Sequence, residues 1–94
     1  MATATWNGSV IATSDDVVEM DGYWYFPRNA VREGVLRDSS TTSVCTFKGC
    51  ASYFTLHVGE KTNPDAGWSY ASPPQHAAEI AGRVAFWKGV VVDH

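Results

Sequence analysis

The chain has little leucine, no long apolar run and no cluster of basic residues, and each shortage excludes a class of protein. Only Leu36 and Leu56 are present, whereas valine and aromatic residues are frequent, so strands are favoured over a helical bundle. No apolar run is long enough to span a bilayer. The seven lysines and arginines are scattered through a chain of net charge −3, without the basic face that phosphate backbones require. We therefore expect neither a nucleic-acid nor a membrane partner.

Targeting and metal-binding signals are also missing. The opening stretch MATATWNGSVIATSDD has neither the basic start nor the apolar segment of a secretory signal, so a cytoplasmic location is expected. In that compartment Cys45 and Cys50 would be free thiols, with Cys45 packed against its neighbours. Their C-x4-C spacing supplies only two ligands, and no histidine lies at a motif spacing from them. We expect no metal site.

Turn signals divide the chain into short elements. Strands are expected at 9–13, 17–20, 23–26, 43–47, 52–58, 68–71 and 83–92, and short helices within 28–40 and at 75–81. Asp21-Gly22 indicates a hairpin turn, residues 59–67 indicate a loop, and Gly89 a bend in the last strand. The predicted architecture is a mainly-β, compact single domain over residues 1–94. It has about six to seven short strands, in a curled sheet or two packed sheets, and two short helices.

Alternation along residues 52–58 separates two faces. Phe54, Leu56 and Val58 are predicted to enter the core, whereas Tyr53 and His57 share the opposite face. If residues 43–47 and 52–58 form a hairpin, Lys48 at their junction would join that polar face.

Lys48 precedes Gly49, and this pair allows three roles. A lysine beside glycine can meet a phosphate or carboxylate, because the glycine lets the backbone approach closely. Burial can instead make a lysine nucleophilic. The third role is to keep a sheet edge soluble, which spacing alone favours.

Glu19 and the aromatic residues are the remaining candidates. Glu19 lies mid-strand among apolar residues, so it must face water or find a partner such as Arg28 or Lys48. Four Trp, four Tyr and four Phe are more than a small domain is expected to hide with every indole and phenol satisfied. Some should line a concavity where a flat ring or a cation stacks. Trp68 and Tyr70 share a strand face and would form two of its walls.

The order of several motifs resembles a known family. The chain carries W-N-G from Trp6, then C-x-x-K-G-x-A-x-Y at 45–53, W-x-Y at 68–70 and I-x-G-x-V-A-F-W at 80–87. Together they resemble the domain of unknown function 427, also labelled a nucleotidyltransferase domain, over about residues 6–87. Two positions depart from the family pattern: Thr46 stands where proline is frequent, and Trp87 where tyrosine is common.

The resemblance implies a compact β fold, similar in outline to tent-shaped sheets of zinc-binding and ligand-binding domains, and it implies no established reaction. Its recurring positions single out Lys48, Tyr53, Trp68 and Tyr70. The leading hypothesis is a small soluble module that binds an unidentified small molecule. Lys48 and the backbone of Gly49 would contact an anionic or carbonyl group while the three rings stack on the ligand. Glu19 and His57 complete the set of candidate ligand-binding residues.

Two alternatives stay open. The first is a nucleotidyl or other group-transfer enzyme, in which Glu19 or His57 acts as a base beside Lys48 and Mg²⁺ is the cofactor; otherwise no cofactor is expected. Against it, the sequence has no D-x-D pair and no glycine-rich phosphate loop. The second is a protein-interaction or structural domain, including a homodimer formed through a β edge or an exposed aromatic patch.

Overall fold

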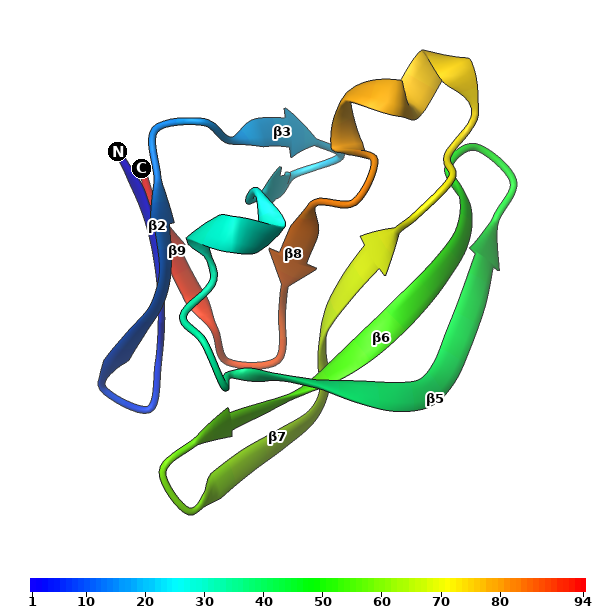
Figure 1. Cartoon of the computed structure of the whole chain (residues 1–94). Helices are drawn as coiled ribbons and strands as arrows, with labels where there is room; N and C mark the ends of the chain where they lie inside the picture. Colours follow the sequence, from blue (N-terminus) through cyan, green and yellow to red (C-terminus); the bar gives the residue numbers. More distant parts are fainter.

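The computed structural model describes residues 1–94 as nine strands and two 3-10 helices (Figure 1). The elements are β1 (Ala2–Trp6), β2 (Ser9–Ser14), β3 (Val18–Met20), β4 (Tyr23–Tyr25), η1 (Arg28–Ala30), β5 (Leu36–Cys45), β6 (Gly49–Val58), β7 (Lys61–Tyr70), η2 (Gln75–Ile80), β8 (Val84–Phe86) and β9 (Val91–Asp93). They form three antiparallel sheets, with strand orders β2-β1-β9, β3-β4 and β5-β6-β7-β8. The mainly-β, compact fold predicted from composition is confirmed. No helix is both long enough and apolar enough to cross a bilayer.

The two larger sheets stand on opposite sides of the molecule, with η1 and the β3–β4 hairpin between them (Figure 1). Ile11 of β2 and Leu56 of β6 are among the fully buried side chains that join these sheets in one apolar cluster. Phe54 and Val58 belong to the same cluster, so the core face predicted for residues 52–58 is confirmed. Burial of such side chains contributes about 1.5–3 kcal/mol each.

A second apolar cluster covers the other face of the four-stranded sheet. Trp68 and Tyr70 of β7 lie two residues apart and therefore share this face. Tyr25 of β4 and Ile80 of η2 pack onto them. The β3–β4 hairpin and η2 are thus the elements that cover the sheet where the candidate residues lie.

The hairpin turn predicted at Asp21-Gly22 is confirmed, and it joins β3 to β4. Both residues have positive φ, 54° and 85°, as the tightest two-residue hairpin turn requires. Glu19 accepts a hydrogen bond from the Gly22 N–H at 2.9 Å, which closes the turn further. This turn determines where Asp21 and the aromatic residues of β4 point.

The short helix expected within 28–40 is confirmed as Arg28–Ala30, after which Gly34 turns the chain at φ 86° and Leu36 pairs with Leu56. Two other predicted elements differ from the structure. The loop expected at 59–67 is mostly strand: β7 pairs with β6 throughout, apart from a bulge. Pro64 lies in that bulge, where its missing N–H interrupts no ladder bond.

The final strand expected at 83–92 is broken rather than bent. Lys88 and Gly89 both have positive φ, 54° and 90°, and they separate β8 from β9. β8 completes the four-stranded sheet, whereas β9 pairs with β1, a strand that the sequence analysis did not predict. The turn between β8 and β9 faces the candidate site described below.

Candidate functional site

Lys48, at the turn between β5 and β6, is folded inward. Only 8% of the residue is exposed, and its ammonium group forms an ion pair with Asp21 of the β3–β4 turn. The hydrogen bond to Asp21 raises the pKa of Lys48, an effect that burial opposes. A role in keeping a sheet edge soluble is therefore wrong, because the side chain is not on the surface. The anion that Lys48 meets in this structure belongs to the chain itself.

Trp68 is the centre of a group of rings that we call the aromatic cluster. Its members are Tyr23, Tyr25, Tyr53, Trp68 and Trp87. The Tyr23 ring lies edge-on to Trp68 at 4.8 Å between centroids, and the Trp87 ring at 5.7 Å. Tyr25 is also edge-on, at 6.4 Å, whereas the Tyr53 ring is tilted by 40° at 6.3 Å. Such edge-on pairs add about 0.5–1.5 kcal/mol beyond the area they bury. The cluster therefore packs two strands, β4 and β6, and the β8–β9 turn against one indole of β7.

Two of the three rings predicted to stack on a ligand, Trp68 and Tyr53, form side-chain hydrogen bonds within the chain, and Tyr70 forms none. Trp68 Nε1 donates to the Tyr25 hydroxyl at 3.3 Å, and the Tyr53 hydroxyl pairs with Ser43 Oγ at 3.1 Å. Trp68 and Tyr70 are each only 7% exposed. Burial raises the pKa of Tyr70 and of Tyr25. Trp68 and Tyr70 thus belong to the core, and their predicted contact with a ligand stays a prediction.

An open cleft lies beside this cluster, between the β3–β4 turn and the β8–β9 turn. We call it the aromatic cleft; its volume is about 270 Å³ and it is lined by Gly22, Tyr23, Trp24, Phe86, Trp87, Val90 and Val92. Tyr23 and Trp87 are 38% and 39% exposed, so both rings pack on Trp68 and also reach solvent. Six of its seven lining residues are hydrophobic, and three of them are aromatic rings of Tyr and Trp.

Polar contacts hold the rim of the aromatic cleft in position. Trp87 Nε1 donates to the backbone carbonyl of Asp65 at 2.6 Å, and the Lys88 ammonium lies 5.2 Å from the centre of a Trp87 ring. On the other wall, His94 stacks on Trp24 at 4.7 Å with the two rings 9° from parallel. A cation and a flat ring of the chain itself therefore already occupy positions over the two indoles.

The structure brings five of the seven predicted site residues together. Lys48, Gly49, Tyr53, Trp68 and Tyr70 all lie on or beside the face of the four-stranded sheet that η2 and β4 cover.

Glu19 and His57 are placed differently. Glu19 is exposed on β3, where it caps the hairpin turn and has neither Arg28 nor Lys48 as an ion-pair partner. His57 pairs with Thr62 near the β6–β7 turn, four residues along β6 from Tyr53, or roughly 13 Å. It does not join the group around Lys48.

Two features of the site were not predicted. Asp21 was recognised only as a turn residue, because no spacing rule brings residue 21 to residue 48. The convergence of residues 22–24 and 86–92 on one cleft likewise depends on tertiary packing. The only signal in the sequence was the surplus of aromatic residues.

Cys45 lies near Lys48 and carries a nucleophilic thiol whose pKa is lowered. Backbone N–H groups of Lys48 and Phe47 stabilise its thiolate and lower the pKa of the thiol. Cys45 is half-buried and free, and Cys50 is free and exposed. No group of three His, Cys, Asp or Glu side chains is placed to hold a metal ion.

Fold and site together define a mainly-β domain in which one covered sheet face supports an aromatic cleft. The family model described as "Domain of unknown function (DUF427)", with the label NTP_transf_9, matches residues 1–94. The chain belongs to this family, as the resemblance in its motifs predicted. No curated protein matches the chain.

Proposed function

We propose that this domain binds a small, flat and largely apolar molecule in the aromatic cleft. The observation that carries the proposal is that Tyr23 and Trp87 are partly exposed while Trp68 holds both rings edge-on from beneath. Rings fixed in this way lose little conformational entropy when a ligand packs against them. The volume of about 270 Å³ suits a molecule of one or two fused rings.

Lys48 takes part in this proposal mainly through Asp21. Their ion pair fixes the turn that carries Gly22 and Tyr23 into the cleft. Direct contact between Lys48 and an anionic group of the ligand requires Asp21 to move aside. The Asp21 side chain is 61% exposed, which leaves it room to do so. These two roles of Lys48 predict different effects of its substitution on the binding of charged and neutral ligands.

Group transfer is the weaker proposal. His57 lies away from Lys48, and Glu19 already accepts a backbone hydrogen bond in the hairpin turn. Neither is therefore poised as a base beside the lysine.

The test is an NMR titration with indole, uracil, succinimide and benzoate as probes. Saturable shifts at Trp24 and Trp87 indole N–H signals are expected from at least one probe. Tyr23→Ala should weaken that binding about tenfold, because stacking on one ring contributes about 0.5–1.5 kcal/mol beyond its buried area. Phe47→Ala is the matched control, since Phe47 is an exposed ring that does not line the cleft. No saturation by any probe at millimolar concentration would refute the proposal.

The same titration distinguishes the two roles of Lys48. If Lys48 contacts an anionic group, Lys48→Met should weaken benzoate binding and leave indole binding unchanged. If Lys48 acts only by holding the turn, Lys48→Met and Asp21→Asn should weaken both probes by similar factors.

A further inference from the structure

Two further clefts lie beside η1, and Arg28 lines both of them. The first, of about 220 Å³, is lined by Arg28, Val31, Arg32, Glu33, Gly34 and Leu36. The second, of about 320 Å³, is lined by Pro27, Arg28, Asn29, Ala81, Gly82 and Arg83. Three of the four arginines of the chain therefore lie along two adjoining clefts.

Arg28 and Arg32 have no partner within the chain. Neither guanidinium makes a side-chain hydrogen bond or an ion pair, whereas every N–H of a guanidinium is a donor. Arg28 is nevertheless positioned, because its guanidinium lies 4.8 Å from the centre of the buried Phe54 ring. Stacking on Phe54 holds the group in place and leaves its N–H edge free for a ligand.

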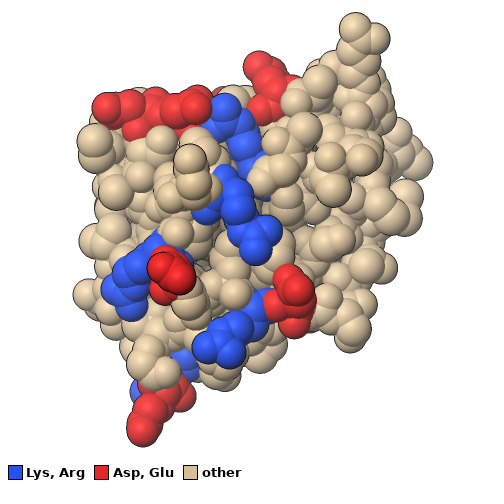
Figure 2. Space-filling view, viewed as in Figure 1, with Lys and Arg blue, Asp and Glu red and all other residues tan.

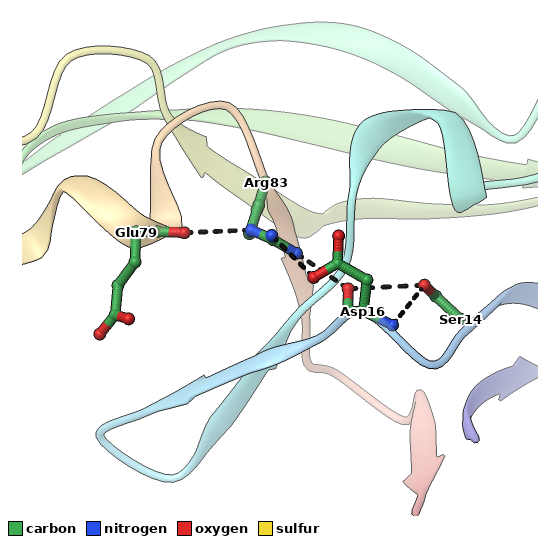
Figure 3. A network of polar contacts seen from close by, with 4 residues as sticks. All are labelled: Ser14, Asp16, Glu79 and Arg83. Atoms are coloured by element: carbon green, nitrogen blue, oxygen red, sulfur yellow. Dashed lines mark hydrogen bonds and ion pairs between the residues drawn. The ribbon is translucent and has the colours of Figure 1, made fainter.

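Arg83, at the end of the second cleft, contrasts with these two. It donates to the Glu79 carbonyl at 3.0 Å, to the Asp16 carbonyl at 2.8 Å and to the Asp16 carboxylate at 3.0 Å (Figure 3). Ser14 Oγ in turn accepts a hydrogen bond from the Asp16 backbone N–H at 2.9 Å. The charge of Arg83 is thus largely met within the chain, and its role is to tie η2 to the β2–β3 loop.

Basic side chains outnumber acidic ones around the first cleft. Figure 2, viewed as Figure 1, shows Lys and Arg side chains in a band across the molecule, with Asp and Glu side chains beside and between them. The chain as a whole carries a net charge of −3. Glu33 is the one acidic residue that lines the first cleft, and it forms no ion pair. Two arginines against one carboxylate leave that cleft with an excess of positive charge.

We propose that Arg28 and Arg32 bind a phosphate group in the first cleft, either as free phosphate or as the terminal monoester of a small molecule. Guanidinium forks match the paired oxygens of phosphate, and such charge-assisted hydrogen bonds are about twice as strong as neutral ones. This site is separate from the aromatic cleft, with which it shares no lining residue.

The experiment follows the arginine Nε–H signals by NMR during a titration with inorganic phosphate at constant ionic strength, with potassium chloride as the reference salt. The signals of Arg28 and Arg32 should shift together and saturate. Arg37, which lines none of the clefts, is the internal control and should not follow them. Unsaturable shifts, or equal shifts at Arg37, would overturn the proposal, because they indicate only screening by salt.

Variants sharpen the result. Arg28→Gln and Arg32→Gln should each lower phosphate affinity about fivefold or more, whereas Arg37→Gln should not. Arg32→Gln keeps the test valid if loss of the Phe54 contact disturbs the Arg28 variant. Glu33→Gln should raise the affinity about twofold, because it removes the repelling charge. If Arg28→Gln and Arg32→Gln both bind phosphate as tightly as the unmodified domain, the proposed site is wrong.

A second titration with methyl phosphate identifies the source of the group. Affinity equal to or higher than that for inorganic phosphate indicates a phosphorylated small molecule. Lower affinity indicates free phosphate.

Discussion

Replacing Asp21 by asparagine would leave the Lys48 ammonium group charged, inward-facing and without its counter-ion. Asparagine tolerates positive φ, so the turn at φ 54° should survive the change and the loss should report on the ion pair. The Lys48 side chain is 10% exposed and that of Asp21 61%. The pair therefore lies between an exposed ion pair, worth about 0–1 kcal/mol, and a buried one, whose disruption costs about 3–5 kcal/mol.

We expect Asp21→Asn to lower the free energy of unfolding by about 2 kcal/mol, after allowing for the solvent that screens Asp21. For a domain of this size that corresponds to a fall in Tm of about 10 °C. Lys48→Met should cost less, because methionine retains the apolar stem and the carboxylate left behind can be solvated. The order of the two variants is thus part of the prediction.

Urea unfolding at neutral pH, followed by tryptophan fluorescence, measures both differences. The pH dependence adds a check of sign. The pKa of Lys48 is raised in the folded state, so the stability from the pair is fully present below the unfolded pKa and is lost as pH rises beyond about 10.5. The gap between the unmodified domain and Asp21→Asn should therefore narrow at strongly alkaline pH. The reasoning would be refuted if the free energy of unfolding of Asp21→Asn lay within about 0.5 kcal/mol of that of the unmodified domain, roughly the scatter for surface substitutions. It would also be refuted if Lys48→Met lowered the free energy of unfolding more than Asp21→Asn does.

Three other predictions concern acidity and backbone geometry. With Cys50 replaced by serine, alkylation of Cys45 by iodoacetamide should show a pH midpoint below 9.0, since backbone N–H groups lower the pKa of the thiol; a midpoint at or above 9.0 contradicts this. Hydrogen bonds from the hydroxyls of Ser39 and Thr41 hold the pKa of Asp65 below its usual value, so the stability that Asp65 contributes is present above pH 3.8 and is lost as pH falls. The difference in Tm between the unmodified domain and Asp65→Asn should therefore shrink from pH 6 to pH 3. A constant difference would argue against this. Gly22→Ala should lower the free energy of unfolding in urea by about 1–2 kcal/mol, because Gly22 has φ 85°. Gly67→Ala should have little effect, because the atoms nearest to an added Cβ lie at 3.5 Å, an ordinary contact distance. Equal effects of the two variants would contradict the role of φ.

Local patterns in the sequence were sufficient for part of the fold. Asp21-Gly22 predicted its hairpin because positive φ at two successive positions has few chemical solutions. Alternation predicted the buried face of residues 52–58 because a strand with one covered face repeats every two residues. Each of these features depends only on residues that are neighbours along the chain.

One error arose where strand pairing prevailed over local composition, although the two strands are neighbours along the chain. The polar composition of residues 59–67 indicated a loop, yet β6 provides a hydrogen-bonding edge along which these residues extend as β7. A bulge accommodates Pro64 and lets Asp65 adopt φ 56° without ending the strand. A single sequence does not reveal that such an edge is available.

The candidate site shows the same division. The motif containing Lys48 and Gly49 and the W-x-Y motif at 68–70 did fall on one sheet face, as adjacent strands allow. Their environment was not predictable, because Asp21 is 27 residues from Lys48 and the aromatic cleft combines residues 22–24 with residues 86–92. The sequence therefore indicates the aromatic residues and the lysine, but not which rings stay open to solvent.

The pairing of β1 with β9 has a consequence for how the chain folds. Thr3 lies opposite Asp93, so this ladder closes a loop of almost the whole domain. Contacts of such sequence separation form slowly, because loop-closure entropy is lost before the contacts are gained. During synthesis β2 and β1 can form a hairpin early, but β1 keeps an unpaired edge until residues 91–93 emerge from the ribosome. Until then that edge is open to other strands, and this interval is when the nascent domain is most exposed to misassembly.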